Sequence, residues 1–181
     1  MNRQHEIAEA MQRAVNVFQR RPEMGLHDDA AGRAVWKGGT RVSNLHDSGL
    51  QMDTDMPKEL GGSGDCVSPG WLFRAGIAAC STTVIAMIAA SQGITLDHLE
   101  IVVSSQSDTR GVLGMQDSAG ELINPGPQAI GMQVSIRAAG VDAAVLQRLV
   151  EEGLQRSPMQ SALLRHPPLS VQVLIDQDMA A

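Results

Sequence analysis

The sequence predicts an α+β fold, because its strand segments come in runs of two that helical segments separate. Stretches with apolar residues at every second position alternate with stretches that follow the period of a helix. A βαβ protein would instead place a helix between each strand and the next. The chain has 181 residues, of which 43% are hydrophobic. One domain of this size can bury a core of its own.

The first predicted element is an amphipathic helix over residues 3–20. Its apolar side chains recur at helical spacing between charged and amide residues. Arg20, Arg21 and Pro22 end it, and a polar loop then separates the helix from the next apolar segment. We therefore expect residues 1–30 to form an N-terminal helix and loop extension, and residues 31–181 to form the main domain.

A β-hairpin is expected after this extension. Two extended segments, around residues 33–45 and 50–55, are joined by the turn residues His46-Asp47-Ser48-Gly49. The glycine-rich residues 61–64 follow. They lack the Lys and Ser/Thr of a phosphate-binding loop, so we interpret them as a hinge.

A long helix is the next predicted element. Ser68-Pro69 supplies an N-cap residue and a proline at the first helical position, and Gly93 marks its end. The helix is apolar on nearly every face, so we expect it to be buried all round at the centre of the fold. Its apolar part, residues 75–90, is shorter than the roughly 20 residues that a membrane span needs.

The C-terminal half should supply three strands and two helices. Strands are predicted around residues 99–105 and 130–138, the second from its clear period of two. A helix that begins after Asp142 follows, and then a shorter helix that begins at Ser157-Pro158. Residues 169–175 alternate again and predict a last strand.

The composition excludes several classes of function. The net charge is −6 without any Lys/Arg cluster, which excludes the basic surface that nucleic acid or an anionic membrane requires. The N-terminus shows no signal-peptide pattern, so we expect a cytoplasmic protein. Cys66 and Cys80 are far apart, which suggests neither a disulfide framework nor a zinc site. The sequence implies no cofactor.

Cys80 is the candidate for chemistry. It lies in the middle of the long helix, on a face with Phe73, Gly76 and Ile77, where Gly76 leaves room beside the sulfur. A free cysteine is usually a small buried apolar residue. A reactive thiolate needs a nearby cation or a helix N-terminus, and here a cation would have to come from elsewhere in the fold. Position alone leaves both roles open.

Several runs of sequence resemble the OsmC/Ohr family. Residues 57–62 (PKELGG) and 68–80 (SPGWLFRAGIAAC) are similar to the stretch that leads to the peroxidatic cysteine of that family. Residues 108–114 (DTRGVLG) are similar to its D-x-R-G-x-L-G turn, and Ser157-Pro158 falls where the family usually has Cys-Pro. Residues 38–41 (GGTR) resemble the strand that brings an arginine to the thiol.

The resemblance implies an intertwined homodimer, with long central helices packed against antiparallel sheets from both chains. It also implies reduction of organic hydroperoxides, in which one cysteine attacks, a second closes a disulfide and an external thiol restores the pair. Cys80 would be the attacking thiol and Arg41 its activating cation. The residues that would line the binding site are Phe73, Gly76, Ile77 and Ser157.

The sequence departs from the family pattern at four positions. Gly70 replaces a glutamate, and Ser81 replaces a residue that is often aromatic. Thr40 aligns with the arginine, so that Arg41, one residue later on a strand, would point to the opposite face. Ser157 replaces the second cysteine, which implies a one-cysteine cycle with an external thiol. The alternative is an inactive dimeric module that binds a small apolar ligand.

The other polar residues have simpler interpretations. Cys66 should lie about 18 Å from Cys80 along the helix axis, beyond the roughly 7 Å that a disulfide spans between Cα atoms. His27-Asp28-Asp29 is expected to be a solvated loop rather than a metal site. Arg110 is expected to form a turn ion pair, and Ser157 to cap a helix.

Overall fold

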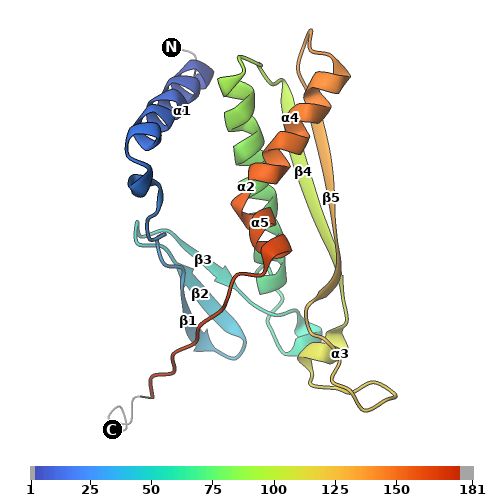
Figure 1. The fold of residues 1–181 in the computed structure, drawn as a ribbon. Coiled ribbons are helices and arrows are strands. Elements are labelled where there is room, and N and C mark those ends of the chain that lie inside the picture. Colours follow the sequence, from blue (N-terminus) through green and yellow to red (C-terminus); the bar gives the residue numbers. More distant parts are fainter. Residues whose placement is uncertain (1–2, 176–181) are drawn as a thin grey trace.

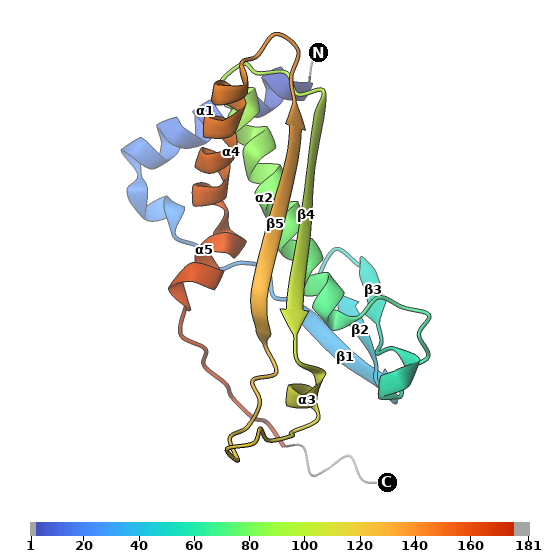
Figure 2. The same ribbon diagram turned by 90° about the vertical axis from the view of Figure 1, so that its right-hand side faces the viewer.

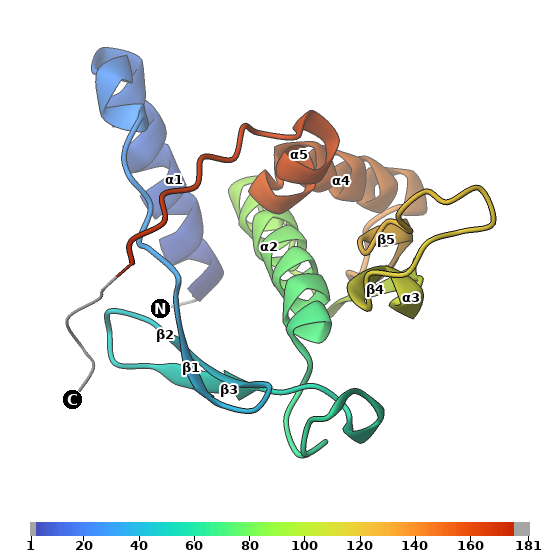
Figure 3. The ribbon, with the colours of Figure 1, turned by 90° about the horizontal axis from the view of Figure 1, so that it is seen from below.

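The computed structural model describes residues 3–175 and confirms the α+β class. In chain order the elements are α1 (Arg3–Arg20), η1 (Pro22–Gly25), β1 (Arg33–Gly38), β2 (Arg41–Leu45), β3 (Gln51–Thr54), η2 (Lys58–Leu60), α2 (Pro69–Ser91), β4 (His98–Ser107), α3 (Thr109–Val112), β5 (Pro127–Arg137), α4 (Ala143–Arg156) and α5 (Pro158–Arg165). α2 is central, with α1 on one side and α4, α5, β4 and β5 on the other (Figures 1 and 3).

The strands form two separate antiparallel sheets, β1-β2-β3 and β4-β5. The segment 33–45 was expected to be one extended piece, but it is two strands joined by a tight turn. Gly38 and Gly39 have φ of 106° and 56°, values that favour glycine and let the chain reverse here. Figure 2 shows the long β4-β5 pair beside α2, and the three-stranded sheet near the lower, N-terminal end of that helix.

The core lies between α2, α4 and the inner face of the β4-β5 sheet. Ile85, Ile88, Ile101 and Leu149 are buried there. A Cβ on Gly153 of α4 would lie only 2.3 Å from Cγ1 of Ile85. The absence of a side chain at Gly153 therefore allows the two helices to approach closely.

The sequence had suggested a central helix buried on all sides, but this prediction is wrong. Ile77, Ser81 and Ile85 are buried, whereas Trp71 is 45% exposed and Met87 is 38% exposed. The other elements of residues 3–175 leave part of the helix uncovered. α2 has 23 residues and is long and apolar enough to cross a membrane on length and composition, so the length argument was wrong. Because α2 packs against α1, β4, α4 and α5, it is a core helix of this fold.

The expected last strand is not formed. Residues 169–175 are extended but have no strand partner among the described residues, and Leu169 is 89% exposed. A strand needs a neighbouring edge for its backbone hydrogen bonds, and the described chain offers none here. Figure 1 shows the segment leaving α5 for the lower end of the fold without joining a sheet.

Candidate functional site

Cys80 lies on α2 and is half-buried. The hydroxyl of Ser157, between α4 and α5, donates a hydrogen bond to its Sγ at 3.4 Å. The same hydroxyl lies 3.0 Å from Oγ of Ser81, the residue after Cys80. The structure thus brings together the two positions that resemble the family's cysteine pair. We call Cys80, Ser81 and Ser157 the thiol–hydroxyl site.

The side chain of Ser157 does not cap α5, although Ser157 occupies the N-cap position. The expectation of a capping hydroxyl was wrong in this respect. Ser157 is fully buried, and a buried hydroxyl needs a partner inside the protein. Ser81, which is also fully buried, supplies one. Sequence reasoning noted Ser81 only as a departure from the family pattern, and no local signal marked it as a partner of Ser157.

The two other side chains of the thiol–hydroxyl site, Ser81 and Ser157, are uncharged hydroxyls. Among residues 3–175, the hydrogen-bond partner of the Cys80 sulfur is a hydroxyl. The hydroxyl can hold the sulfur in position. Activation of a cysteine usually needs a cation or a helix N-terminus nearby, so a further group is needed here.

The predicted binding residues differ in their surroundings. Ile77 and Ser157 are buried, while Phe73 is 37% exposed. A Cβ at Gly76 would be 4.0 Å from Cε of Met159 on α5, which is an ordinary contact. Gly76 therefore leaves space between α2 and α5 on the helix face that carries Cys80.

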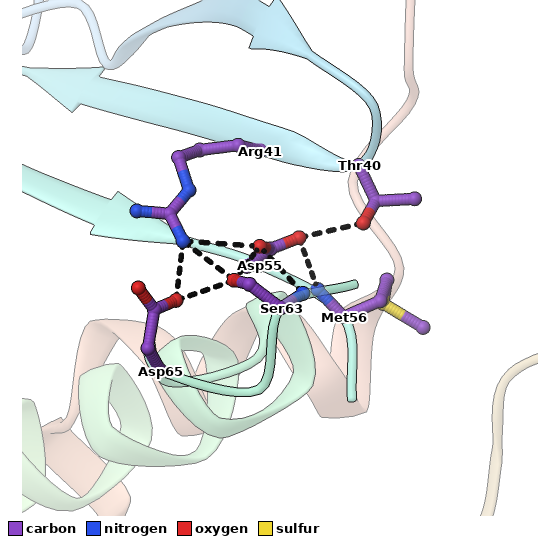
Figure 4. A network of polar contacts seen from close by, with 6 residues as sticks. All are labelled: Thr40, Arg41, Asp55, Met56, Ser63 and Asp65. Atoms are coloured by element: carbon purple, nitrogen blue, oxygen red, sulfur yellow. Dashed lines mark hydrogen bonds and ion pairs between the residues drawn. The ribbon is translucent and has the colours of Figure 1, made fainter. Parts of the chain in front are cut away.

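Arg41 lies in a different place, in a polar group that we call the Asp55 cluster: Thr40, Arg41, Asp55, Ser63 and Asp65 (Figure 4). The Asp55 carboxylate accepts hydrogen bonds from the Thr40 hydroxyl at 2.6 Å, Nη2 of Arg41 at 3.2 Å and the backbone N–H of Ser63 at 3.1 Å. Arg41 also donates to the Ser63 hydroxyl at 2.6 Å and to Asp65. Asp55 itself is buried.

The hydrogen bonds of this cluster fix its charges. Those from the Ser63 and Thr40 hydroxyls hold the pKa of Asp55 well below its ordinary range. The Ser63 hydroxyl and then Arg41 also lower the pKa of Asp65, and the bond to Asp65 raises the pKa of Arg41. Burial raises the pKa of the nearby Cys66 thiol, although Arg41 opposes that rise. The field of Arg41 thus reaches Cys66.

Strand alternation had predicted that the side chains of Thr40 and Arg41 point to opposite faces, but they do not. Both side chains reach the same carboxylate. The reason is that Thr40 belongs to the turn and only Arg41 begins β2, so the alternation of a strand does not yet apply. Sequence reasoning missed Asp55 because its partners come from separate turn and loop segments.

One chain does not bring Arg41 to Cys80. Ser63 and Asp65 belong to the loop that precedes α2, which begins at Pro69. Cys80 lies further along α2, roughly 16 Å from Pro69 along the helix axis. The two residues to which the resemblance assigned catalytic roles, Cys80 and Arg41, thus lie in separate regions of the described chain.

The remaining polar candidates have structural surroundings. Arg110 forms the expected ion pair with Asp108 at 2.6 Å. A Cβ at Gly70 would lie 3.6 Å from Nη1 of Arg74. Both cysteines are free thiols. Within residues 3–175, no group of three His, Cys, Asp or Glu side chains could hold a metal ion.

Comparison with known proteins gives a consistent result. A family profile described as OsmC-like protein matches residues 62–172. An organic hydroperoxide resistance protein of Xanthomonas axonopodis pv. citri (strain 306) is 31% identical over 142 residues, which cover 78% of this chain and 89% of the relative.

Two solved structures share the fold. The OsmC-like protein of Mycoplasma pneumoniae superposes with a TM-score of 0.63 at 18% identity, over 77% of this chain and 89% of that one. An organic hydroperoxide resistance protein OsmC of Legionella pneumophila gives a TM-score of 0.55 at 24% identity, over 76% and 90%. At these identities the two structures support the fold alone.

Proposed function

The chain belongs to the OsmC-like protein family, and from this premise we propose that it reduces organic hydroperoxides with the thiol of Cys80. The observation that carries the proposal is the hydrogen bond from Ser157 to the Cys80 sulfur at 3.4 Å. It joins the two positions that correspond to the reactive cysteine pair of the family. The Xanthomonas relative, whose name refers to resistance to organic hydroperoxides, supports the same chemistry.

The proposed reaction starts with attack by the Cys80 thiolate on the terminal oxygen of the hydroperoxide. The S–O bond forms as the O–O bond breaks, so that sulfur is oxidised to a sulfenic acid and the peroxide is reduced. The departing alkoxide takes up the proton that the thiol lost and leaves as an alcohol. The Ser157 hydroxyl, which donates to the sulfur, holds the thiolate in position.

An external thiol completes the proposed cycle. Its thiolate attacks the sulfenic acid, forms a mixed disulfide and releases water. A second thiol then releases Cys80 and leaves as the oxidised disulfide. Ser157 has no sulfur and cannot take the place of this reductant, which makes the cycle a one-cysteine cycle.

We further propose that the active form is a homodimer. Large apolar side chains are 45–89% exposed in one chain: Trp36 and Leu50 of the three-stranded region, Trp71 of α2, and Leu169. So much apolar surface on one molecule is typical of an interface. Light scattering should give twice 19.2 kDa; a stable monomer at micromolar concentration would contradict this architecture.

Arg41 enters the proposal as a residue of the second chain. Within one chain it pairs with Asp55 and Asp65, away from Cys80. The exposed side of α2 could receive another chain close to Cys80, since Ala79 and Thr83 on that side are exposed. We propose that Arg41 assists Cys80 across this subunit boundary.

The remaining parts of the proposal follow the sequence. Residues 1–30 are an extension and residues 31–181 are the OsmC-like domain. The protein acts in the cytoplasm on a small hydroperoxide, without a cofactor and without a nucleic acid or membrane partner. The net charge of −6 supports the last point.

A second candidate function is a dimeric module that binds a small apolar ligand, with Cys80 inert. The engagement of Arg41 by two carboxylates favours it. The hydrogen-bond partner of Cys80 in the described chain is also neutral, whereas reactive cysteines usually have positive charge nearby.

Multiple-turnover consumption of cumene hydroperoxide with dithiothreitol as reductant separates the two functions. Wild type and the matched control Cys66→Ser, which removes the other thiol, should consume the peroxide at similar rates. Cys80→Ser should consume it no faster than buffer with reductant. If wild type is no faster than Cys80→Ser, the binding module replaces the enzyme.

A further inference from the structure

Arg41 has two carboxylate partners, and the fold holds them with different firmness (Figure 4). Both accept hydrogen bonds from the same nitrogen, Nη2: Asp55 at 3.2 Å and Asp65 in a shorter contact. The Ser63 hydroxyl also accepts from Nη2. Within residues 3–175, Nε and Nη1 of Arg41 donate no hydrogen bond. These donors remain available to another partner.

Asp55 is fixed by groups other than Arg41. Its side chain is only 4% exposed. It accepts hydrogen bonds from the Thr40 hydroxyl at 2.6 Å, the backbone N–H of Met56 at 2.8 Å and the backbone N–H of Ser63 at 3.1 Å. A buried charge is costly to leave without its partners, so Asp55 stays where these donors hold it.

Asp65 is held far less firmly. Its side chain is 61% exposed, and its side-chain donors include Arg41 and the Ser63 hydroxyl. Gly64, which joins Asp65 to Ser63, has φ of 71°, and a Cβ there would meet only the flexible side chain of Lys58. Exposed ion pairs contribute little net free energy. Asp65 can therefore exchange Arg41 for water at small cost.

The charges of the cluster decide which arrangement can activate a thiol. With both carboxylates bound, Arg41, Asp55 and Asp65 carry one positive and two negative charges, a net charge of −1. A negative neighbour disfavours a thiolate, whereas a positive neighbour favours it. Arg41 can thus assist the thiol of a second chain only after one carboxylate has left, and Asp65 is the one that can leave.

We propose that Asp65 is a positioning residue that acts on Cys80 through Arg41 and holds Arg41 in an inactive arrangement. The inference rests on the proposed function, in which Arg41 assists Cys80 of a second chain. When that chain presents its thiolate, the sulfur takes the place of Asp65 on the guanidinium. Asp65 turns into solvent, while Asp55 keeps Arg41 in position. Consumption of the thiolate lets Asp65 return.

The rate at which iodoacetamide alkylates Cys80 tests this role, because alkylation reports the reactivity of the thiolate without any peroxide. In the homodimer, Asp65→Asn should be alkylated at Cys80 about fivefold faster than wild type, the size expected for loss of an exposed ion pair. Asp65→Glu keeps the carboxylate and should stay close to wild type.

Glu59→Gln is the matched control. It removes the same charge from an exposed residue of η2, and Glu59 makes no hydrogen bond to Arg41. Its alkylation rate at Cys80 should equal that of wild type. Equal acceleration in Glu59→Gln and Asp65→Asn would show an effect of net charge alone and would overturn the inference.

A double variant separates this role from a structural one. If Asp65 acts through Arg41, Asp65→Asn should give no acceleration in protein that already carries Arg41→Gln. Loosening of the fold would instead accelerate alkylation of Cys80 with and without Arg41. Acceleration in both backgrounds, or a rate in Asp65→Asn that is unchanged or slower, would overturn the inference.

The proposed function and this inference can fail separately. If wild type does not turn over cumene hydroperoxide but Asp65→Asn accelerates alkylation only where Arg41 is present, the inference stands and the enzyme does not. If wild type turns over the peroxide and Asp65→Asn leaves the alkylation rate unchanged, the enzyme stands and the role of Asp65 is wrong.

Discussion

The Asp55 cluster and the thiol–hydroxyl site both hold polar groups inside the fold, but by different means. Asp55 is an ionised carboxylate with donors from Thr40, Arg41 and Ser63. Cys80 has one hydroxyl donor, whose own partner is another hydroxyl. The cation and the thiol that the resemblance assigned to one site therefore lie in two regions of the chain.

This difference shows which part of the proposed site one chain completes. Within one chain the charges of the Asp55 cluster are satisfied by their partners, Arg41 by Asp55 and Asp65. The thiol–hydroxyl site is positioned but lacks a cation within the described chain. In the homodimer that we propose, a second chain supplies this cation. Four variants test the comparison between the two regions.

The largest expected effect is a change of product in Ser157→Cys. The Ser157 hydroxyl is 3.4 Å from the Cys80 sulfur, so a second sulfur there needs to move little over 1 Å to reach the disulfide length of about 2.05 Å. After one equivalent of cumene hydroperoxide, mass mapping should find a disulfide between positions 80 and 157. If the variant is folded and oxidised but keeps both sulfurs unlinked, the contact between α2 and the α4–α5 junction is wrong.

The next effect concerns Arg41. Arg41→Gln should slow oxidation of Cys80 by about tenfold, as expected for loss of a charge-assisted interaction. Mixed dimers of Arg41→Gln with Cys80→Ser carry one thiol and one arginine on different chains. If Arg41 acts across the boundary, these dimers should recover half of the wild-type rate.

No recovery in purified mixed dimers would place Arg41 and Cys80 in one functional unit of the same chain. An unchanged rate in Arg41→Gln homodimers would instead make the Asp55 cluster purely structural. Either result would break the proposed link between the two regions.

A smaller effect is expected from Asp55→Asn, and it depends on pH. The folded pKa of Asp55 lies below its unfolded value, which is about 3.9. Its stabilising contribution is therefore complete above the unfolded pKa and is lost as pH falls toward the folded pKa. Thermal unfolding should show Asp55→Asn below wild type at pH 7, with the two converging below pH 4.

Asp142→Asn is the control for that series, because the Asp142 side chain makes no capping hydrogen bond. Its melting temperature should follow that of wild type at every pH. A constant difference between Asp55→Asn and wild type from pH 7 to pH 3 would show that ionisation of Asp55 does not stabilise the fold.

The smallest effect on chemistry is expected from Ser81→Ala. The Ser81 hydroxyl contacts the one on Ser157, which contacts the sulfur, so its influence on Cys80 is indirect. Loss of the buried hydroxyl pair should lower the free energy of unfolding by about 1–2 kcal/mol. Stopped-flow oxidation should be slowed by less than about threefold. A loss as large as that of Arg41→Gln would mean that Ser81 acts on the sulfur directly.

Most elements were predictable because their periods are local. The helices α1, α2, α4 and α5 and the strands β4 and β5 lie close to where the apolar spacing placed them. The prediction of one extended segment over residues 33–45 was wrong, because two glycines with positive φ turn the chain inside a continuous extended pattern. The prediction of a strand over residues 169–175 was wrong, because alternation indicates an extended backbone but does not supply the edge of a neighbouring strand.

The site was only partly predictable. Cys80 and Ser157 were paired through the family resemblance, and the structure places them in contact. The Asp55 cluster has no signature in the sequence, because its surroundings form only when distant segments meet. Side-chain partners of this kind require the fold itself.

Trapping of a sulfenic acid on Cys80 tests the central claim most directly. Wild-type protein treated with one equivalent of cumene hydroperoxide and then dimedone should carry the adduct on the peptide that contains Cys80. Cys66 should remain unlabelled, and the Cys80→Ser variant should show no adduct. The contradicting result is no adduct on Cys80 of wild type, while the Ser157→Cys variant still forms its disulfide. The protein would then not be a one-cysteine peroxide reductase, although the fold assignment would stand.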